Sequence, residues 1–97
     1  MHPLPQTGVL TFLFTDIEGS TTRWERAPDA MARALAVHDA IVSETVEAHG
    51  GTVFKRLGDG FCCVFPMPAR AAEAAIEVQR KLASQAWDRA VGGLRVR

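Results

Sequence analysis

Residues 52–65, TVFKRLGDGFCCVF, limit the possible folds of this chain more than any other stretch. Two runs rich in β-branched and aromatic residues flank Gly58-Asp59-Gly60, and a short glycine-rich turn between such runs is typical of an antiparallel β-hairpin. We expect the second strand to end at Pro66, because proline cannot donate to a strand ladder. The chain is therefore predicted to contain an antiparallel sheet, which the remaining elements must cover.

Ahead of the hairpin, the sequence predicts one more strand and a short helix. Val9–Thr15 (VLTFLFT) is apolar, aromatic or β-branched throughout, as in a buried strand. Thr22 and Glu25 have the spacing of a capping box, which favours a short helix from near Ser20 to about Arg26.

A long helix is predicted between that short helix and the hairpin. Pro28 interrupts the short helix, and Asp29 can cap a second helix from about Ala30 to Ala48. Gly50-Gly51 is expected to end it. Residues at helical spacing that would form its apolar face are Met31, Leu35, His38, Val42 and Thr45.

A third helix is predicted after the hairpin, with Pro68 in its first turn and its end before Gly92-Gly93. Its apolar face would comprise Ala72, Ala75, Ile76, Gln79 and Leu82. Leu94–Arg97 (LRVR) alternates apolar and basic residues, as at the start of another strand. The order β-α-α-β-β-α-β predicts an α+β fold, a ferredoxin-like α/β sandwich with helices on one face and a C-terminally truncated last strand. The domain would span residues 8–97, after a lead of residues 1–7.

Composition narrows the class of protein. The 97 residues suit one small domain, and 47% hydrophobic and 23% charged residues are ordinary globular values. A formal net charge of zero argues against a dedicated nucleic-acid-binding protein. No apolar run approaches the ~20 residues that span a membrane, and the N-terminus lacks a signal-peptide pattern. Adjacent Cys62 and Cys63 would point to opposite faces of a strand, which indicates free thiols and a cytoplasmic location.

Two carboxylates are predicted to meet at one edge of the sheet. Asp16 follows the first strand and Asp59 lies in the hairpin turn, so pairing of these strands would bring both to the same end. Such a pair suits Mg²⁺, which binds few protein oxygens and completes its coordination with water and phosphate. Each residue alone also has a simpler interpretation, since Asp59 is a good turn residue and Asp16 could cap a helix.

The loop IEGST and Lys55 could complete a nucleotide site. Unpaired backbone N–H groups at a glycine-containing strand-to-helix turn, with the partial positive charge of the helix start, suit a polyphosphate. The same loop could be an ordinary capped connection. Lys55 lies on the first hairpin strand and could donate to a purine acceptor, or simply extend to solvent.

The motifs FTDIEGST and HGGTVFKRLGDGFCCVF together resemble the class III adenylate/guanylate cyclase catalytic domain, particularly bacterial adenylate cyclases. The resemblance covers about residues 8–97. It implies that Asp16, Asp59 and the Ile17 carbonyl bind two Mg²⁺ or Mn²⁺ ions, and that Lys55 selects adenine, where guanylate cyclases typically have Glu. The residues implied to hold the triphosphate are Glu18, Gly19, Ser20 and Thr21. Arg56 departs from the family pattern, which usually has Thr there.

The resemblance also implies a function and a partner. Such domains convert ATP to 3′,5′-cyclic AMP and pyrophosphate by two-metal catalysis, in intracellular signalling. They work as dimers, in which one protomer supplies the metal aspartates and the other supplies the lysine. That second protomer also supplies another base-selecting residue, with an Asn and an Arg that stabilise the transition state, all on elements beyond Arg97. We therefore expect the 97-residue chain alone to be inactive. The alternative is a non-catalytic module that binds Mg-nucleotide or dimerises within a larger signalling protein.

Two-metal chemistry needs no protein base, so His38 and His49 are not assigned catalytic roles. His38 shares an apolar helix face and is expected to be a packing or interface residue. Trp24 and Trp87 are expected to anchor the core or an interface.

Overall fold

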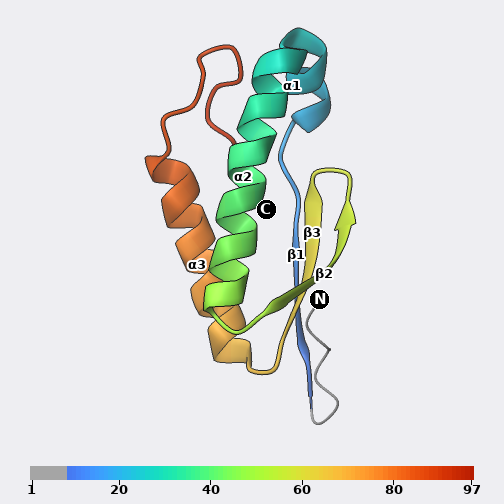
Figure 1. The fold of residues 1–97 in the computed structure, drawn as a ribbon, viewed down its shortest axis with the longest axis vertical. Coiled ribbons are helices and arrows are strands. Elements are labelled where there is room, and N and C mark those ends of the chain that lie inside the picture. Colours follow the sequence, from blue (N-terminus) through green and yellow to red (C-terminus); the bar gives the residue numbers. More distant parts are fainter. Residues whose placement is uncertain (1–8) are drawn as a thin grey trace.

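The computed structural model describes residues 9–97, and the predicted lead, residues 1–7, lies outside the described residues. The elements in chain order are β1 (Thr11–Thr15), α1 (Ser20–Arg26), α2 (Pro28–Ala48), β2 (Thr52–Leu57), β3 (Gly60–Phe65) and α3 (Pro68–Ser84) (Figure 1). This order matches the prediction as far as α3, and the α+β fold class is confirmed.

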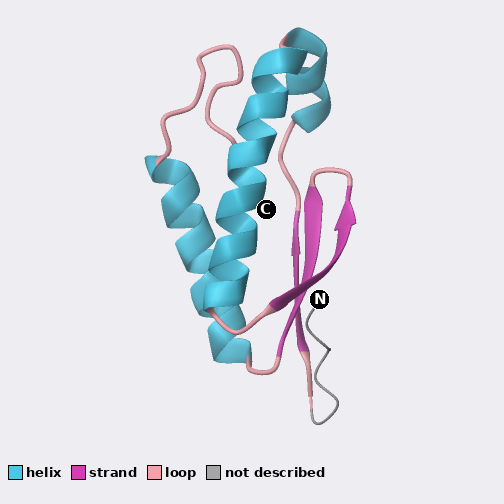
Figure 2. Cartoon of the chain, viewed as in Figure 1, coloured by secondary structure: helices cyan, strands magenta, loops and turns pink. Residues whose placement is uncertain are grey.

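The three strands form one antiparallel sheet in the order β1-β3-β2. The helices α2 and α3 lie side by side over one face of this sheet (Figures 1 and 2). The central strand β3 is buried along its whole length, because neighbours flank it on both edges. Cys63 and Phe65 belong to the core beneath the helices, whereas Cys62 lies on the other face, so the two cysteines are free and point apart as predicted.

Both helix starts differ in detail from the sequence prediction. The α1 helix begins after Gly19 with no side-chain cap, so Thr22 lies inside the helix and the predicted capping box does not form. The α2 helix begins at Pro28 rather than near Ala30, with Ala27 as an N-cap residue that makes no side-chain cap. Proline suits the first helical position because its fixed φ fits the helix and its missing N–H would have no partner there. Asp29 therefore lies in the first turn instead of capping it.

The predicted apolar face of α2 is confirmed, but that of α3 is wrong at most positions. The buried residues of α3 are Ala71, Ala74, Val78 and Leu82. Ile76, predicted to face the core, is 55% exposed. These positions recur every three or four residues, so the inner face of α3 is rotated by about one residue from the predicted face. The helix ends at Ser84, ahead of an irregular segment that reaches Gly92-Gly93.

The C-terminal segment, predicted to start another strand, runs beside the continuation of β1 but forms only an isolated antiparallel bridge between Ile17 and Val96. Asp16 and Arg97 exchange two backbone hydrogen bonds of 2.9 Å, and the Glu18 N–H donates to the Arg95 carbonyl at 2.8 Å. Within residues 9–97, no helix is both long and apolar enough to cross a lipid bilayer.

Gly60 sets how closely the hairpin can approach β1. A Cβ atom at this position would lie 2.6 Å from the Thr15 carbonyl oxygen, a backbone atom that cannot move without shifting β1. We expect Gly60→Ala to lower the free energy of unfolding by about 1–3 kcal/mol. Urea denaturation would measure this, with Gly93→Ala as the control, because no heavy atom of residues 9–97 other than those of its two chain neighbours lies within 4 Å of a Cβ there. Equal loss of stability in the two variants would contradict the steric argument.

Candidate metal and nucleotide site

Both predicted carboxylates lie at the end of the sheet where β1 finishes. Thr15, the last residue of β1, pairs with Phe61, and the Phe61 N–H also donates to Thr15 Oγ1 at 3.2 Å. Asp16 follows Thr15 directly, and Asp59 lies in the turn just before β3. The structure therefore places Asp16 and Asp59 at the same end of two adjacent strands.

The Asp16 carboxylate is accessible to solvent, with its side chain 53% exposed, while its backbone is fixed by the two hydrogen bonds to Arg97. Its Oδ2 atom lies 3.4 Å from Arg97 Nη2, in an ion pair that is exposed and therefore weak. A cation that approaches this carboxylate would meet little resistance from that pair.

Ile17 anchors the backbone between the two acidic residues of the loop. Its side chain is buried, with 2% exposure, and belongs to the hydrophobic core. Ile17 and Val96 form a non-hydrogen-bonded pair of the antiparallel bridge, because the ladder bonds are made by Asp16 and Glu18 on either side. The Ile17 carbonyl is consequently directed away from the C-terminal segment.

The backbone of Glu18 is held from both sides. Its N–H donates to the Arg95 carbonyl at 2.8 Å, and its carbonyl accepts from Arg23 Nη1 at 2.5 Å. Its N–H is thus already used, unlike those of the next three residues. The N–H groups of Gly19, Ser20 and Thr21 donate to no acceptor among residues 9–97.

The loop turns at Gly19, which has φ of +64°. This left-handed conformation is open to glycine without the steric cost that a side chain would add. It turns the chain from the strand direction into α1 and leaves the three N–H groups unpaired. The predicted phosphate loop therefore retains donors, supplied by residues 19–21.

Lys55 is exposed on β2 and pairs with Cys62 of β3, beside an irregularity in the ladder between Val53 and Lys55. Because β3 separates β2 from β1, Lys55 and Asp16 lie on opposite outer strands of the sheet. The structure thus brings Asp16, Ile17 and Asp59 to one end of the sheet. Lys55 lies on the opposite outer strand, away from Asp16.

Arg56, the residue that departs from the family pattern, fastens β2 to α2. Its guanidinium forms an ion pair with Asp39 and lies over the Phe61 ring, 4.9 Å from the ring centroid. The other carboxylate oxygen of Asp39, Oδ1, lies 2.9 Å from Nδ1 of His38. His38 is fully buried and packs edge-on against Phe61, which fits the packing role expected for it.

The two tryptophans differ in their surroundings. Trp87 packs against the core and donates its indole N–H to the Leu82 carbonyl at 3.0 Å, as expected of an anchor. Trp24 is 36% exposed on α1.

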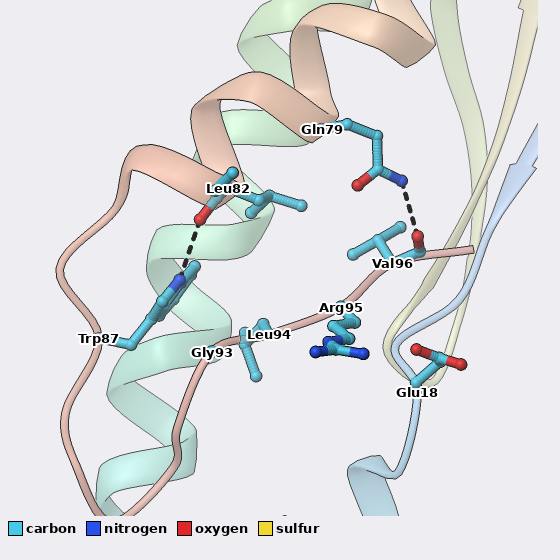
Figure 3. Close-up of a pocket in the computed structure, with 9 residues that line it drawn as sticks. Glu18, Gln79, Leu82, Trp87, Gly93, Leu94, Arg95 and Val96 are labelled. Carbon is cyan, nitrogen blue, oxygen red and sulfur yellow. Dashed lines mark hydrogen bonds between the residues drawn. The ribbon is translucent and has the colours of Figure 1, made fainter.

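A separate cavity of about 410 Å³ lies between α3 and the C-terminal segment (Figure 3). Its lining residues are Glu18, Gln79, Leu82, Ala83, Trp87, Gly93, Leu94, Arg95 and Val96. The Gln79 amide closes one side by donating to the Val96 carbonyl at 2.7 Å. Asp16, Asp59 and Lys55 do not line this cavity, so it is distinct from the carboxylate pair and shares only Glu18 with the loop.

Within residues 9–97, no group of three or more His, Cys, Asp or Glu side chains is placed to hold a metal ion. The candidate metal ligands at this end of the sheet are instead the carboxylates of Asp16 and Asp59 and the carbonyl of Ile17. All three are oxygen atoms, which suit Mg²⁺ and Mn²⁺, and a site with few protein ligands is typical of Mg²⁺ bound together with phosphate. The residues present therefore fit such ions.

Sequence reasoning missed Arg23, whose side chain contacts the loop and the C-terminal segment. The sequence did offer one indication, because Arg23 lies four residues after Gly19 and therefore about one helical turn from the loop. Its hydrogen bonds to the carbonyls of Val91 and Gly93 join segments about 70 residues apart, so no local sequence pattern predicts them.

Comparisons with known proteins identify the family of the chain. Residues 3–91 match the family model described as the adenylate and guanylate cyclase catalytic domain. The chain belongs to this family. An adenylate cyclase of Lachancea kluyveri is 40% identical over 83 residues, which are 86% of this chain and 4% of that enzyme. An uncharacterized protein of Mycobacterium tuberculosis is 42% identical over 79 residues, 79% of this chain and 28% of that protein.

A solved structure of adenylate cyclases from Trypanosoma brucei in their monomeric state superimposes on this cyclase-family chain with a TM-score of 0.84 and 26% sequence identity. The match covers 91% of this chain and 53% of the other. The chain thus spans a small part of its two sequence relatives and about half of this structural neighbour.

Proposed function

We propose that the chain is part of a class III adenylate cyclase catalytic domain, which converts ATP to 3′,5′-cyclic AMP and pyrophosphate. The observation that carries this proposal is the position of Asp16 and Asp59 at one end of the sheet, next to a loop with unpaired N–H groups. Membership of the cyclase family and similarity to an adenylate cyclase support it.

The residues at the end of β1 would bind the reacting part of the substrate. Asp16, Asp59 and the Ile17 carbonyl would hold Mg²⁺ or Mn²⁺, and Gly19, Ser20 and Thr21 would donate N–H groups to the triphosphate. When bound, two such ions lower the pKa of the ribose 3′-hydroxyl and stabilise the charge on the departing pyrophosphate. The 3′-hydroxyl would lose its proton to water as its oxygen forms a bond to the α-phosphorus, and the bond between that phosphorus and the pyrophosphate oxygen would break to release pyrophosphate. The loop orients the triphosphate for this in-line exchange.

Lys55 would select the base of a nucleotide that is bound at Asp16 and Asp59 of a second copy of the chain. Its ammonium group can only donate hydrogen bonds, which suits the acceptor N1 of adenine. Because Lys55 and Asp16 lie on opposite outer strands, a homodimer offers the simplest way to bring both to one nucleotide. Exposed Phe12, Phe14 and Phe54 cluster on the sheet, and such a patch favours self-association.

The two thiols fit a structural role in a reducing, cytoplasmic compartment. Both cysteines are free and buried. Burial, with a smaller contribution from Cys62, raises the pKa of the Cys63 thiol to about 11. Cys63 is therefore protonated and unreactive at neutral pH.

Cyclic AMP formation tests the proposal. We expect a protein that contains these residues and the rest of the catalytic domain to convert ATP to cyclic AMP with Mn²⁺ or Mg²⁺. The 97-residue chain alone should bind the metal nucleotide but turn it over poorly, because each missing group that stabilises the transition state costs about 10²–10³ in rate. Chromatography of the products measures both. Nucleotide binding without cyclic AMP in the complete domain would instead indicate a non-catalytic module, and rapid turnover by the short chain would contradict the expected division of the site.

A further inference from the structure

The side chain of Arg23 in α1 binds three backbone carbonyls from two distant segments. Its Nη1 donates to the Glu18 carbonyl at 2.5 Å, Nε to Val91 at 3.0 Å and Nη2 to Gly93 at 3.0 Å. The planar guanidinium presents donors in a fixed fork, so it can satisfy several carbonyls at once. Arg23 therefore links the loop after β1 to a segment about 70 residues later in the chain.

The C-terminal segment to which Arg23 donates is itself held by the hydrophobic core. Val91 and Leu94 are buried in the hydrophobic core on either side of the Gly93 carbonyl. Through Arg23, the loop after β1 is attached to this fixed point as well as to its own strand.

On the loop side, Arg23 restrains the peptide that leads into the unpaired donors. The Glu18 N–H is already bound to Arg95, so the Arg23 contact fixes the carbonyl at the other end of the same residue. A Cβ atom at Gly19 would lie 3.0 Å from Arg23 Nη1, which shows how closely the guanidinium lies against the loop backbone. The orientation of the following N–H groups depends on this peptide.

We propose that Arg23 is a positioning residue for the triphosphate, which holds the N–H groups of Gly19, Ser20 and Thr21 in a binding orientation without itself contacting phosphate. This inference rests on the proposed function of the loop. All three nitrogens of the guanidinium donate to carbonyls, so the side chain acts through the backbone of Glu18. Geometry, rather than positive charge, is the property that matters.

Calorimetry with Mg²⁺ and inorganic tripolyphosphate, which lacks a base, tests the role of Arg23 in the 97-residue chain. Arg23→Lys keeps the charge but loses the fork, Arg23→Gln loses both, and Arg26→Gln removes the same charge from an exposed position on the same helix. We expect both Arg23 variants to bind tripolyphosphate about tenfold more weakly, as loss of net hydrogen-bond stabilisation implies, and Arg26→Gln to bind nearly as the wild type does. Circular dichroism would confirm that each variant is folded. If Arg23→Gln does not fold, Arg23→Lys alone is compared with the wild type.

Hydrogen exchange of the same proteins without ligand gives a second readout. Amides of residues 18–21 and 91–93 should exchange faster together in Arg23→Lys, and neither segment should change in Arg26→Gln. Three results would overturn the positioning role and leave the proposed function standing. These are wild-type affinity for tripolyphosphate in Arg23→Lys, an equal loss of affinity in Arg26→Gln, and unchanged hydrogen exchange in Arg23→Lys. A wild-type chain that does not bind Mg-tripolyphosphate would overturn the proposed function, and this inference with it.

Discussion

Replacing Asp16 or Asp59 by asparagine should lower cyclic AMP formation by the complete catalytic domain by at least about 10²-fold. The amide keeps the size of the side chain but removes the negative charge that would hold a divalent cation. Asp16 directly follows β1 and Asp59 directly precedes β3, so both residues lie at the same end of these two adjacent strands. The loss should therefore appear in kcat/KM with either Mg²⁺ or Mn²⁺.

The matched control for these variants is Glu44→Gln, which removes one negative charge from an exposed position on α2. This control should retain wild-type activity. Full activity in either aspartate variant would show that its carboxylate is not a metal ligand.

Replacing Lys55 by glutamate should shift the nucleotide preference of the complete domain from ATP towards GTP. A carboxylate accepts from the N1–H donor of guanine, whereas it faces the N1 acceptor of adenine without a proton to donate. An unpaired buried polar group costs about 1–3 kcal/mol, roughly a factor of 5 to 150 in the ratio of kcat/KM for ATP and GTP. Conversion should stay incomplete, because the family uses a second base-selecting residue.

Arg80→Glu provides the control for Lys55→Glu, since it makes the same reversal of charge on the exposed surface of α3. It should leave the ATP to GTP ratio unchanged. If Lys55→Glu also leaves that ratio unchanged, Lys55 merely extends to solvent, as its exposure on β2 would allow.

The order of elements could be predicted because its signals are local. The Gly58-Asp59-Gly60 turn, Pro28 and Pro68 each restrict the backbone over a few residues, and the hairpin, α2 and α3 follow from them. The co-location of Asp16 and Asp59 then needs only one further step, the pairing of β1 with β3.

Features that depend on tertiary packing were not predictable in this way. The hydrophobicity of Ile76 predicted that it faces the core, but α3 packs with the face that contains Val78 and Leu82 instead. The three bonds of Arg23 reach carbonyls that are close only once the C-terminal segment has docked. Arg56 likewise finds Asp39 only because β2 packs beside α2.

The central claim is that the end of β1 binds a metal nucleotide, and calorimetry with Mn²⁺ and ATP on the 97-residue chain tests it most directly. We predict measurable binding by the wild-type chain and by Glu44→Gln, and severe weakening in folded Asp16→Ala and Asp59→Ala proteins. Unchanged affinity in both folded alanine variants would contradict the claim.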